Sequence, residues 1–392
     1  MTLVFITDAR FEKTFEGKIY SITGSFNLKL WNRYLEKFDN IVVIARVTNT
    51  EKIPSIELLA NSERVSFVAL PYYIGFGAFL KKRKIIKKML KSQAITGRSY
   101  LCRVPSMLGG LMTNILKNNN IKYGVEVVGD PWDVFSSKII KNCLVPLMRI
   151  YSYFSLRKVV RNASVALYVT KEQLQKRYPT AKGVFSTYAS NVVMPDNLIL
   201  KNIKKFSKTT KNHIKILSVG HLDQMYKAPD VAIDAIGLLT ERGLDCTLKW
   251  IGDGLYKEDM IRYVVKKGLS DRVNFVGRVL PTKVREYMLD CDIFMLISRT
   301  EGLPRAIIEA MGAGLPCIGT RIGGIPELLE NGVLVKQNDA VAVADKIETF
   351  IKDNDFANYH AQRNLTESEQ YKESLLKARR EEFYDKLIQL EK

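Results

Sequence analysis

The stretch SRTEGLPRAIIEAMGAGLPCIGTRIGGIPELL runs from Ser298 to Leu329 and holds the features that decide the fold of its half of the chain. It follows the apolar segment DIFMLIS, which predicts a buried strand, and it turns through Glu301 and Gly302 before a helical pattern begins. Pro304 stands where the helix opens, a position at which a missing N–H costs little. A strand, a turn and a helix N-terminus in this order predict a binding site for an anion such as a diphosphate.

The alternation of short apolar runs with helical patterns extends over the whole chain. In the second half the strand candidates are IKILSVG (214–220), TLKWIGDG (247–254), VNFVG (273–277), DIFMLIS (292–298), LPCIGT (315–320) and GVLV (332–335). In the first half they are LVFI (3–6), IVVIA (41–45), YLCRV (100–104), YGVEVV (123–128) and ALYVT (166–170). Strands regularly separated by helices form parallel sheets. The predicted fold class is therefore α/β, with two Rossmann-like domains that face each other across a cleft.

The length of the chain suits two domains, because 392 residues exceed what one hydrophobic core supports. The lysine-rich segment 198–213 lacks strand periodicity and suits a linker. We therefore expect a first domain over residues 1–205 and a second over 206–368. The final segment, 369–392, predicts a helix that packs back on the first domain. Its apolar stripe consists of Leu375, Leu376, Phe383, Leu387 and Leu390.

Positive charge is concentrated in the first half of the chain. The net charge is +19, and residues 1–200 hold 30 Lys and Arg against 13 Asp and Glu. Such asymmetry indicates that this half meets a polyanion, either an anionic membrane surface or nucleic acid. Two basic amphipathic stretches, 76–93 and 137–162, favour the bilayer surface. Each stretch alone is equally typical of a helix that packs on a sheet and solvates its charged face.

Targeting segments and cysteine chemistry give mainly exclusions. The sequence has no uncharged apolar run of about eighteen residues, and its N-terminus lacks the pattern of a signal peptide. We expect a cytoplasmic protein, peripheral on the inner face of the cell membrane. The cysteines form no CxxC pair and are odd in number, which predicts buried side chains in a reducing compartment with no disulfide and no metal. They are Cys102, Cys143, Cys246, Cys291 and Cys317.

The spacing of Glu301 and Glu309 resembles the E-x7-E signature of retaining glycosyltransferase family 4, which has two facing Rossmann-like domains in the GT-B arrangement. The resemblance continues through SVGHLDQMYKAPDVAIDAI, GDG, VNFVGRV and GGIPEL, whereas the first half is similar only in strand rhythm, VTKEQLQKRYP and the Gly17 loop. It implies an enzyme that moves a sugar from a nucleotide diphosphate sugar to a glycan acceptor, expected to be lipid-linked. The pathway implied is capsule, exopolysaccharide or lipopolysaccharide biosynthesis, with no metal and no cofactor.

The resemblance also implies roles for individual residues. Glu301 contacts the donor sugar near the reacting carbon, Glu309 accepts hydrogen bonds from the ribose hydroxyls, and Lys227 neutralises the leaving diphosphate. His221 follows Gly220 where family members often carry an arginine. A protonated His221 would partly replace that arginine, and a hydrogen-bonded loop residue is the equal alternative. The further donor-binding residues expected are Gly17, Gly277, Arg278, Val279, Ser298, Gly302, Leu303, Pro304 and Arg305.

Two other carboxylate patterns each have a structural alternative. The first domain lacks the histidine that the family often carries, and Asp130 or Glu126 in VEVVGDPWD is a substitute for polarising the acceptor hydroxyl. Asp130 before Pro131 is also a good turn residue. Asp290 and Asp292 spell D-x-D, the metal signature of a different transferase fold. Their place between a helix end and a buried strand predicts a structural role instead.

The predicted catalytic residues are therefore Glu301, Lys227 and Asp130. Two alternative functions remain open from the sequence. A sugar-nucleotide epimerase has the same two-domain fold, but the E-x7-E block and the VNFVGRV segment favour the transferase. A nucleic-acid-binding protein would explain the positive charge, but that charge is absent from the half with the predicted ligand site, so no nucleic-acid partner is expected.

Overall fold

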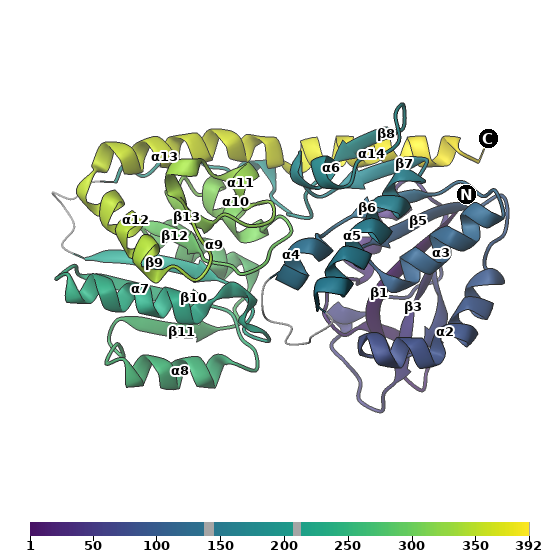
Figure 1. Ribbon diagram of the computed structural model, residues 1–392, viewed down its shortest axis with the longest axis horizontal. Helices are drawn as coiled ribbons and strands as arrows, with labels where there is room; N and C mark the ends of the chain where they lie inside the picture. Colours follow the sequence, from purple (N-terminus) through teal and green to yellow (C-terminus); the bar gives the residue numbers. More distant parts are fainter. Residues whose placement is uncertain (137–144, 207–212, 392) are drawn as a thin grey trace. The chain divides into compact units, whose positions relative to one another are not determined.

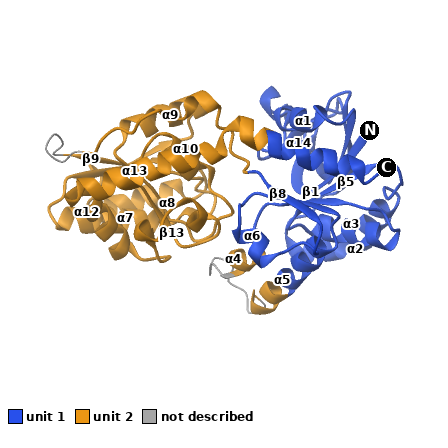
Figure 2. Cartoon of the chain, turned by 90° about the horizontal axis from the view of Figure 1, so that it is seen from above, with its two compact units in different colours: residues 1–129, 151–189, 378–392 blue, residues 130–150, 190–377 orange. Residues whose placement is uncertain are grey.

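The computed structural model describes residues 1–136, 145–206 and 213–391, and its chain divides into two compact units (Figures 1 and 2). Unit 1 comprises residues 1–129, 151–189 and 378–392, and unit 2 comprises residues 130–150 and 190–377. The boundary expected near residue 205 thus lies inside unit 2. The segment 130–150 also belongs to unit 2, although it lies within the range expected for the first domain.

Unit 1 is built on one sheet with the strand order β4-β3-β1-β5-β6-β7-β8, in which every neighbouring pair is parallel. The central strand β1 carries a continuous apolar run, Leu3 to Ile6, that is fully buried, as a parallel strand covered on both faces requires. The strands are β1 (Thr2–Lys13), β3 (Asn40–Asn49), β4 (Val65–Pro71), β5 (Ser99–Val104), β6 (Gly124–Val127), β7 (Val165–Tyr168) and β8 (Phe185–Tyr188), and β2 (Ile19–Ser21) pairs with β1 as an antiparallel hairpin.

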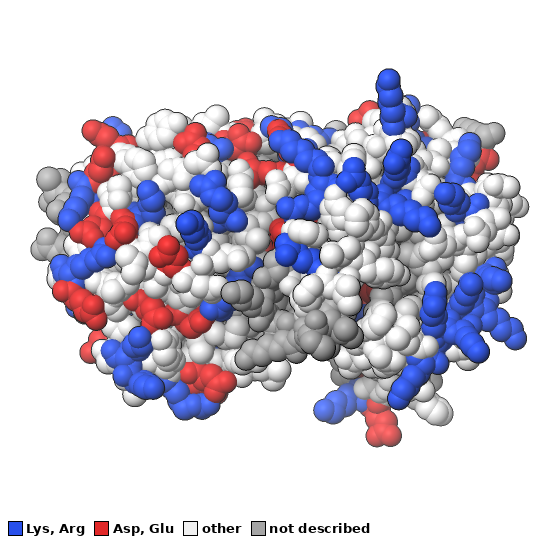
Figure 3. Space-filling view, viewed as in Figure 1, with Lys and Arg blue, Asp and Glu red and all other residues white. Residues whose placement is uncertain are grey.

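Helices connect these strands as βα crossovers (Figure 1). They are α1 (Leu28–Leu35), α2 (Gly75–Lys91), α3 (Met107–Asn118), α5 (Val145–Arg161) and α6 (Gln173–Arg177). The short helix α4 (Pro131–Ser136) belongs to unit 2. On the face shown in Figure 3, Lys and Arg prevail over Asp and Glu on unit 1, whereas both signs mix on unit 2. The basic stretch 137–162 is described only from residue 145, because residues 137–144 lie outside the described part.

The last helix, α14 (Glu373–Gln389), packs its C-terminal part within unit 1. Phe383, Tyr384 and Leu387 are buried, and the Tyr384 ring lies 5.2 Å from the Tyr34 ring, centroid to centroid. A Cβ at Gly124 would lie 3.0 Å from a Leu387 methyl carbon, so the missing side chain lets the helix approach β6. Leu375 of the predicted stripe is 40% exposed and lies off this interface.

Unit 2 contains a six-stranded, wholly parallel sheet with the order β11-β10-β9-β12-β13-β14. Its strands are β9 (Ile214–Val219), β10 (Cys246–Ile251), β11 (Val273–Gly277), β12 (Ile293–Leu296), β13 (Cys317–Thr320) and β14 (Leu334–Val335). Its helices are α7 (Pro229–Glu241), α8 (Lys257–Lys266), α9 (Pro281–Asp290), α10 (Arg305–Gly312), α11 (Ile325–Leu328), α12 (Ala340–Lys352) and α13 (Asn354–Ser368). This order is that of the doubly wound nucleotide-binding fold.

The chemistry of the cysteines and the hydropathy of the helices add two observations. Cys102, Cys246, Cys291 and Cys317 are buried and unbridged, and Cys143 lies outside the described residues. Burial raises the pKa of the Cys246 and Cys291 thiols to about 12, which keeps both protonated.

Within residues 1–136, 145–206 and 213–391, none of the helices has both the length and the apolar character needed to cross a membrane.

Candidate functional site

Unit 2 has a topological switch point between β9 and β12. The two strands are neighbours, with Ile216 opposite Ile293, but the chain continues from β9 to β10 on one side and from β12 to β13 on the other. The loops after such strands diverge, and open α/β sheets bind their ligands at this place. Lys227 follows β9 and Glu301 follows β12, so the topology brings these two predicted residues together.

Lys227 and Glu301 form an ion pair at the switch point. Oε1 of Glu301 also accepts a hydrogen bond of 2.9 Å from Oγ of Ser298, which is itself buried. The two charged side chains are 23% and 10% exposed, so solvent screens the pair only in part. The ion pair thus links the loop after β9, which carries Lys227, to the loop after β12, which carries Glu301.

Missing side chains make room for Lys227. A Cβ at position 220 would lie 2.7 Å from Cγ of Lys227, and a Cβ at position 252 would lie 2.0 Å from the Gly220 carbonyl oxygen. Gly252 also has φ +146°, which other residues rarely adopt. Nε1 of Trp250 donates a 2.9 Å hydrogen bond to the same Gly220 oxygen. The backbone after β9 is therefore pressed against β10, and the lysine stem crosses the place where a side chain would otherwise lie.

Arg299 is a residue of this site that the sequence analysis did not select. Its guanidinium donates two hydrogen bonds, of 2.9 and 2.6 Å, to the carboxylate of Asp230 in the first turn of α7. Its backbone N–H donates a 2.7 Å hydrogen bond to the Tyr226 carbonyl. These contacts join the loop that carries Glu301 to the loop that carries Lys227. The sequence showed an arginine beside the strand end, but not that its partner lies 69 residues earlier.

The N-terminus of α10 faces the same site without a protein cap. Pro304 is the N-cap residue, and no side chain of the described residues caps the first turn. The loop before it is fixed from the other side, because the Gly324 N–H donates a 2.6 Å hydrogen bond to the Gly302 carbonyl. A Cβ at Gly323 would lie 2.2 Å from the Glu301 carbonyl oxygen, which explains the glycine there. The unpaired N–H groups of the first turn favour an anionic ligand.

Glu309 lies on α10 in a different environment from Glu301. Burial raises the pKa of its carboxyl, and the nearby Arg305 and Arg285 oppose that rise. Among the described residues no side chain donates a hydrogen bond to this carboxylate, whereas Glu301 accepts from Lys227 and Ser298. Glu309 is thus a half-buried acceptor whose hydrogen-bonding capacity is unused.

The other predicted donor residues of unit 2 lie at or just after the carboxyl ends of β9, β11 and β12. Gly277 ends β11, and its carbonyl accepts a 2.9 Å hydrogen bond from the Gly252 N–H, which ties the predicted base segment to the loop after β10. Arg278 is exposed and Val279 is half-buried. Two other predicted residues, His221 and Arg305, are also exposed, and Leu303 is half-buried.

Two predicted site residues, Gly17 and Asp130, lie in turns outside this centre. Gly17 lies in unit 1 at the turn between β1 and β2, where φ is +82° and its N–H donates to the Thr14 carbonyl at 3.0 Å. The buried Asp130 precedes α4, and its Oδ1 accepts a 2.9 Å hydrogen bond from the Trp132 N–H. This is the turn-forming alternative that the sequence left open. It occupies one carboxylate oxygen and does not test a role in catalysis.

Glu126, the other predicted substitute for the family histidine, lies inside unit 1. It pairs with Arg103 at 2.8 Å and accepts a 2.7 Å hydrogen bond from the Tyr34 hydroxyl. Its side chain is 7% exposed. This carboxylate is consumed in a buried network that joins β5, β6 and α1.

Comparisons with known proteins decide the family. Residues 201–367 match the family described as glycosyl transferases group 1. Protein CapJ of Staphylococcus aureus is 33% identical over 356 residues, which are 90% of this chain and 86% of CapJ. The chain belongs to the group 1 glycosyl transferases.

Two further proteins are similar to this glycosyltransferase, one in sequence and one in fold. The amylovoran biosynthesis glycosyltransferase AmsK of Erwinia amylovora is 35% identical over 140 residues, which are 33% of this chain and 34% of AmsK. HepE of Anabaena, solved in complex with UDP and glucose, has a TM-score of 0.65 at 17% identity and covers 98% of this chain and 99% of its own. The glycosyltransferase has the two α/β units of the GT-B fold. The comparisons give no support to the epimerase or the nucleic-acid-binding alternative.

The D-x-D pattern of the glycosyltransferase is tied to Lys215 at the amino end of β9. Oδ1 of Asp290 pairs with Nζ of Lys215 at 2.9 Å, and Oδ2 of Asp292 accepts a 3.0 Å hydrogen bond from the Lys215 N–H. Lys215 lowers the pKa of Asp290 below its usual range. Within the described ranges, no cluster of three or more His, Cys, Asp or Glu side chains suits a metal ion.

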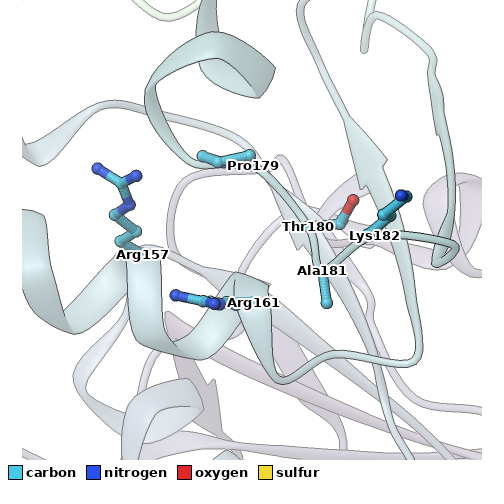
Figure 4. A pocket seen from close by; sticks show the side chains of 6 residues that line it. All are labelled: Arg157, Arg161, Pro179, Thr180, Ala181 and Lys182. Atoms are coloured by element: carbon cyan, nitrogen blue, oxygen red, sulfur yellow. The ribbon is translucent and has the colours of Figure 1, made fainter.

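A pocket of about 300 Å³ lies in unit 1, between the end of α5 and the loop before β8 (Figure 4). Arg157, Arg161 and Lys182 surround it, together with Pro179, Thr180 and Ala181. Since α5 ends and β8 begins here, the pocket lies at the amino edge of the sheet, away from the edge where such sheets bind ligands. It contains none of the predicted site residues.

Proposed function

We propose that this glycosyltransferase binds a nucleoside diphosphate sugar at the switch point of unit 2 and transfers the sugar with retention of its anomeric configuration. The observation that carries the proposal is the Lys227–Glu301 pair beside the uncapped N-terminus of α10. A lysine and free helix amides offer a diphosphate its positive partners, and the adjacent carboxylate is suited to the sugar next to it. The half-buried, unused acceptor Glu309 suits the ribose hydroxyls.

The chemistry follows from where charge develops. The bond between the anomeric carbon and the phosphate oxygen breaks, the acceptor oxygen bonds to the same face of that carbon, and the acceptor proton passes to the departing phosphate. Lys227 leaves Glu301 for the diphosphate as the donor binds, and its ammonium then stabilises the leaving group. The freed Glu301 carboxylate holds the sugar near the developing positive charge. Arg299 keeps both loops in register during this exchange of partners.

Metal-independent transfer is part of the proposal. Lys227 and the α10 amides supply the positive charge that a divalent ion supplies in other transferases. Asp290 and Asp292, the carboxylates with a metal-like spacing, are engaged by Lys215. Turnover is expected to be unchanged in excess EDTA. Loss of activity on chelation, restored by magnesium or manganese, would contradict this part of the proposal.

The acceptor and the location of the enzyme are proposed from the family and the charge. We propose a lipid-linked glycan acceptor in the synthesis of a surface polysaccharide, because AmsK is named for amylovoran biosynthesis. Unit 1 then works at the inner face of the cell membrane, where its excess of Lys and Arg meets anionic lipid.

The test begins with the nucleotide. Calorimetry of the full chain against UDP, GDP, ADP and CDP identifies the base, with UDP the first choice because HepE holds it. Hydrolysis of the corresponding nucleotide sugars in the absence of acceptor then identifies the sugar, and NMR of the released sugar reports its anomeric configuration. Binding of one nucleoside diphosphate is the expected result. Failure of all four to bind to folded protein would overturn the proposed donor site.

A further inference from the structure

Three segments of unit 1 leave its sheet at one edge. The carboxyl ends of β1, β3 and β4 are neighbours, with Lys13 opposite Asn49 and Val47 opposite Pro71. The Thr50 N–H donates a 3.0 Å hydrogen bond to the Lys13 carbonyl, which ties the first two ends together. The β1–β2 turn, the loop after β3 and the start of α2 therefore all lie at this edge.

Large apolar side chains are exposed on each of these segments. We call them the apolar rim, and they are Phe15, Ile53, Ile56, Ile74, Phe76 and Leu80. Their exposed fractions run from 48% at Leu80 to 82% at Ile53, and Phe15 is fully exposed. Single exposed apolar residues are ordinary, but a group gathered at one edge indicates an interaction site.

Basic residues stand directly behind the apolar rim. After Leu80 the helix α2 continues with four exposed cations, Lys81 to Lys84. The rim loops also carry acidic side chains, of which Glu16 is paired with Lys18 at 3.0 Å, while Glu51 and Glu57 are exposed. The excess of positive charge therefore comes from α2. Apolar tips in front of a cationic helix match a bilayer surface, which presents anionic headgroups above hydrocarbon.

We propose that the apolar rim inserts into the headgroup region of an anionic bilayer while the cations of α2 bind the headgroups. The inference rests on the proposed membrane attachment of unit 1 and names the surface that makes it. A bilayer fits better than a protein partner, because the apolar side chains project from three separate segments and the neighbouring surface is rich in lysine, which protein interfaces avoid. The rim would bring the enzyme to a lipid-linked acceptor.

The experiment compares three variants of the full chain on vesicles. The rim variant carries Phe15→Ser, Ile53→Ser and Phe76→Ser, and the charge variant carries Lys81→Gln, Lys84→Gln and Lys88→Gln. The matched control carries Leu255→Ser, Val265→Ser and Leu280→Ser, three apolar residues of unit 2 that are 83%, 62% and 73% exposed. Sedimentation with vesicles of phosphatidylglycerol and phosphatidylcholine is measured at low salt and at about 1 M salt, where the Debye length is about 3 Å.

The expected results separate the two contributions. The rim variant should lose about tenfold or more in vesicle affinity and all of the binding that survives high salt, as removal of buried apolar area requires. The charge variant should lose mainly the salt-sensitive part, and the matched control should bind like the unmodified protein. Nucleotide affinity should be equal in all four proteins, which keeps this test separate from that of the donor site.

Two outcomes would overturn the proposal. Vesicle binding that vanishes at high salt and is equal in the rim variant and the control would leave an attachment by charge alone. Failure of the unmodified protein to bind these vesicles at low salt would also overturn it. A concentration-dependent dimer that the rim variant abolishes in sedimentation velocity would then make a second copy of the chain the occupant of the rim.

Discussion

The switch points of the two units treat their helix N-termini in opposite ways. In unit 1 the carboxylate of Asp8, after the core of β1, accepts a 2.6 Å hydrogen bond from the Met107 N–H at the start of α3, and Ser106 caps the Gly109 N–H at 2.7 Å. In unit 2 no side chain of the described residues caps α10. The same fold thus closes one anion site with its own carboxylate and leaves the other for a ligand.

The comparison shows that the strand order determines where a site lies but not what occupies it. Both sheets reverse their order beside the first strand, yet Asp8 also accepts a 2.9 Å hydrogen bond from Tyr73 and is fully engaged within unit 1. In unit 2 the carboxylate at the switch point, Glu301, follows β12 rather than the first strand, and its partner is Lys227, which the proposed diphosphate would take over. Whether the site is available to a ligand therefore depends on which partners the loop residues give the carboxylate.

The largest effect is expected where the open site loses its cation. Lys227→Ala should lower kcat by about 10² to 10³, because the lysine acts on charge that grows as the phosphate leaves. Steady-state kinetics measure the loss, and circular dichroism checks the fold. Lys215→Ala is the matched control, since it removes a lysine of β9 that also pairs with a carboxylate, that of Asp290, but lies at the amino end of the strand, away from the switch point. Equal kcat in the two variants would contradict the assignment.

The clamp that holds the two loops together should have the next largest effect. Arg299→Ala leaves the partly exposed carboxylate of Asp230 without its bidentate partner and should lower the free energy of unfolding by about 1.5 to 3 kcal/mol, the worth of hydrogen bonds to a charged group. Urea titration measures this loss. The double variant Arg299→Ala, Asp230→Ala should lose less than the sum of the two single variants, because they share one interaction. Strict additivity would show that the clamp is not a unit.

Glu309 should affect donor affinity and its pH dependence. Glu309→Ala should weaken nucleotide binding by about 1.5 to 3 kcal/mol, the worth of hydrogen bonds to a charged group. Since burial raises the pKa of Glu309, the unliganded site takes up a proton above the usual carboxyl range. Affinity should be full at neutral pH and fall as the pH decreases through the raised pKa. Calorimetry across this pH range tests the direction of the change in nucleotide affinity. The affinity of Glu309→Gln should not depend on pH over the same range.

The smallest effect is expected at the closed site. Asp8→Ala removes a helix cap from unit 1 and should lower its stability by about 1 kcal/mol. Nucleotide affinity should be unchanged, because Asp8 lies in unit 1 and the proposed donor site at the switch point lies in unit 2. Thermal unfolding with and without the nucleotide measures both quantities. A variant that lost nucleotide affinity while folded would break the contrast between the two switch points.

The sequence predicted much of unit 2 because its signals are local. Central parallel strands are continuous apolar runs, and the predicted strand DIFMLIS (292–298) contains β12, which is buried throughout. The edge strands β4 and β8 were not predicted, and both are only half-buried in the structure. The assignment of 130–150 to unit 2 depends on long-range packing, which no local pattern encodes.

The site was predictable where a motif names its residues and not where a partner is distant. Lys227 and Glu301 were expected in one site through the family pattern, and the structure pairs them. The bond between Arg299 and Asp230 requires knowing that β9 and β12 are neighbours. The turn before α4 was one of two alternatives for Asp130; its hydrogen bond from the Trp132 N–H shows the turn, and the proposed catalytic role stays a prediction.

The close contacts at Gly220 and Gly252 have a consequence for how the enzyme tolerates substitution. A Cβ at position 220 would clash with the Lys227 side chain, and a Cβ at position 252 would clash with the backbone carbonyl of Gly220. In a library that randomises every loop of unit 2, these two positions should return glycine almost alone, while exposed positions such as Arg278 vary freely. Positions that would tune donor preference can therefore change under selection, whereas the conformation of Lys227 requires glycine at both 220 and 252.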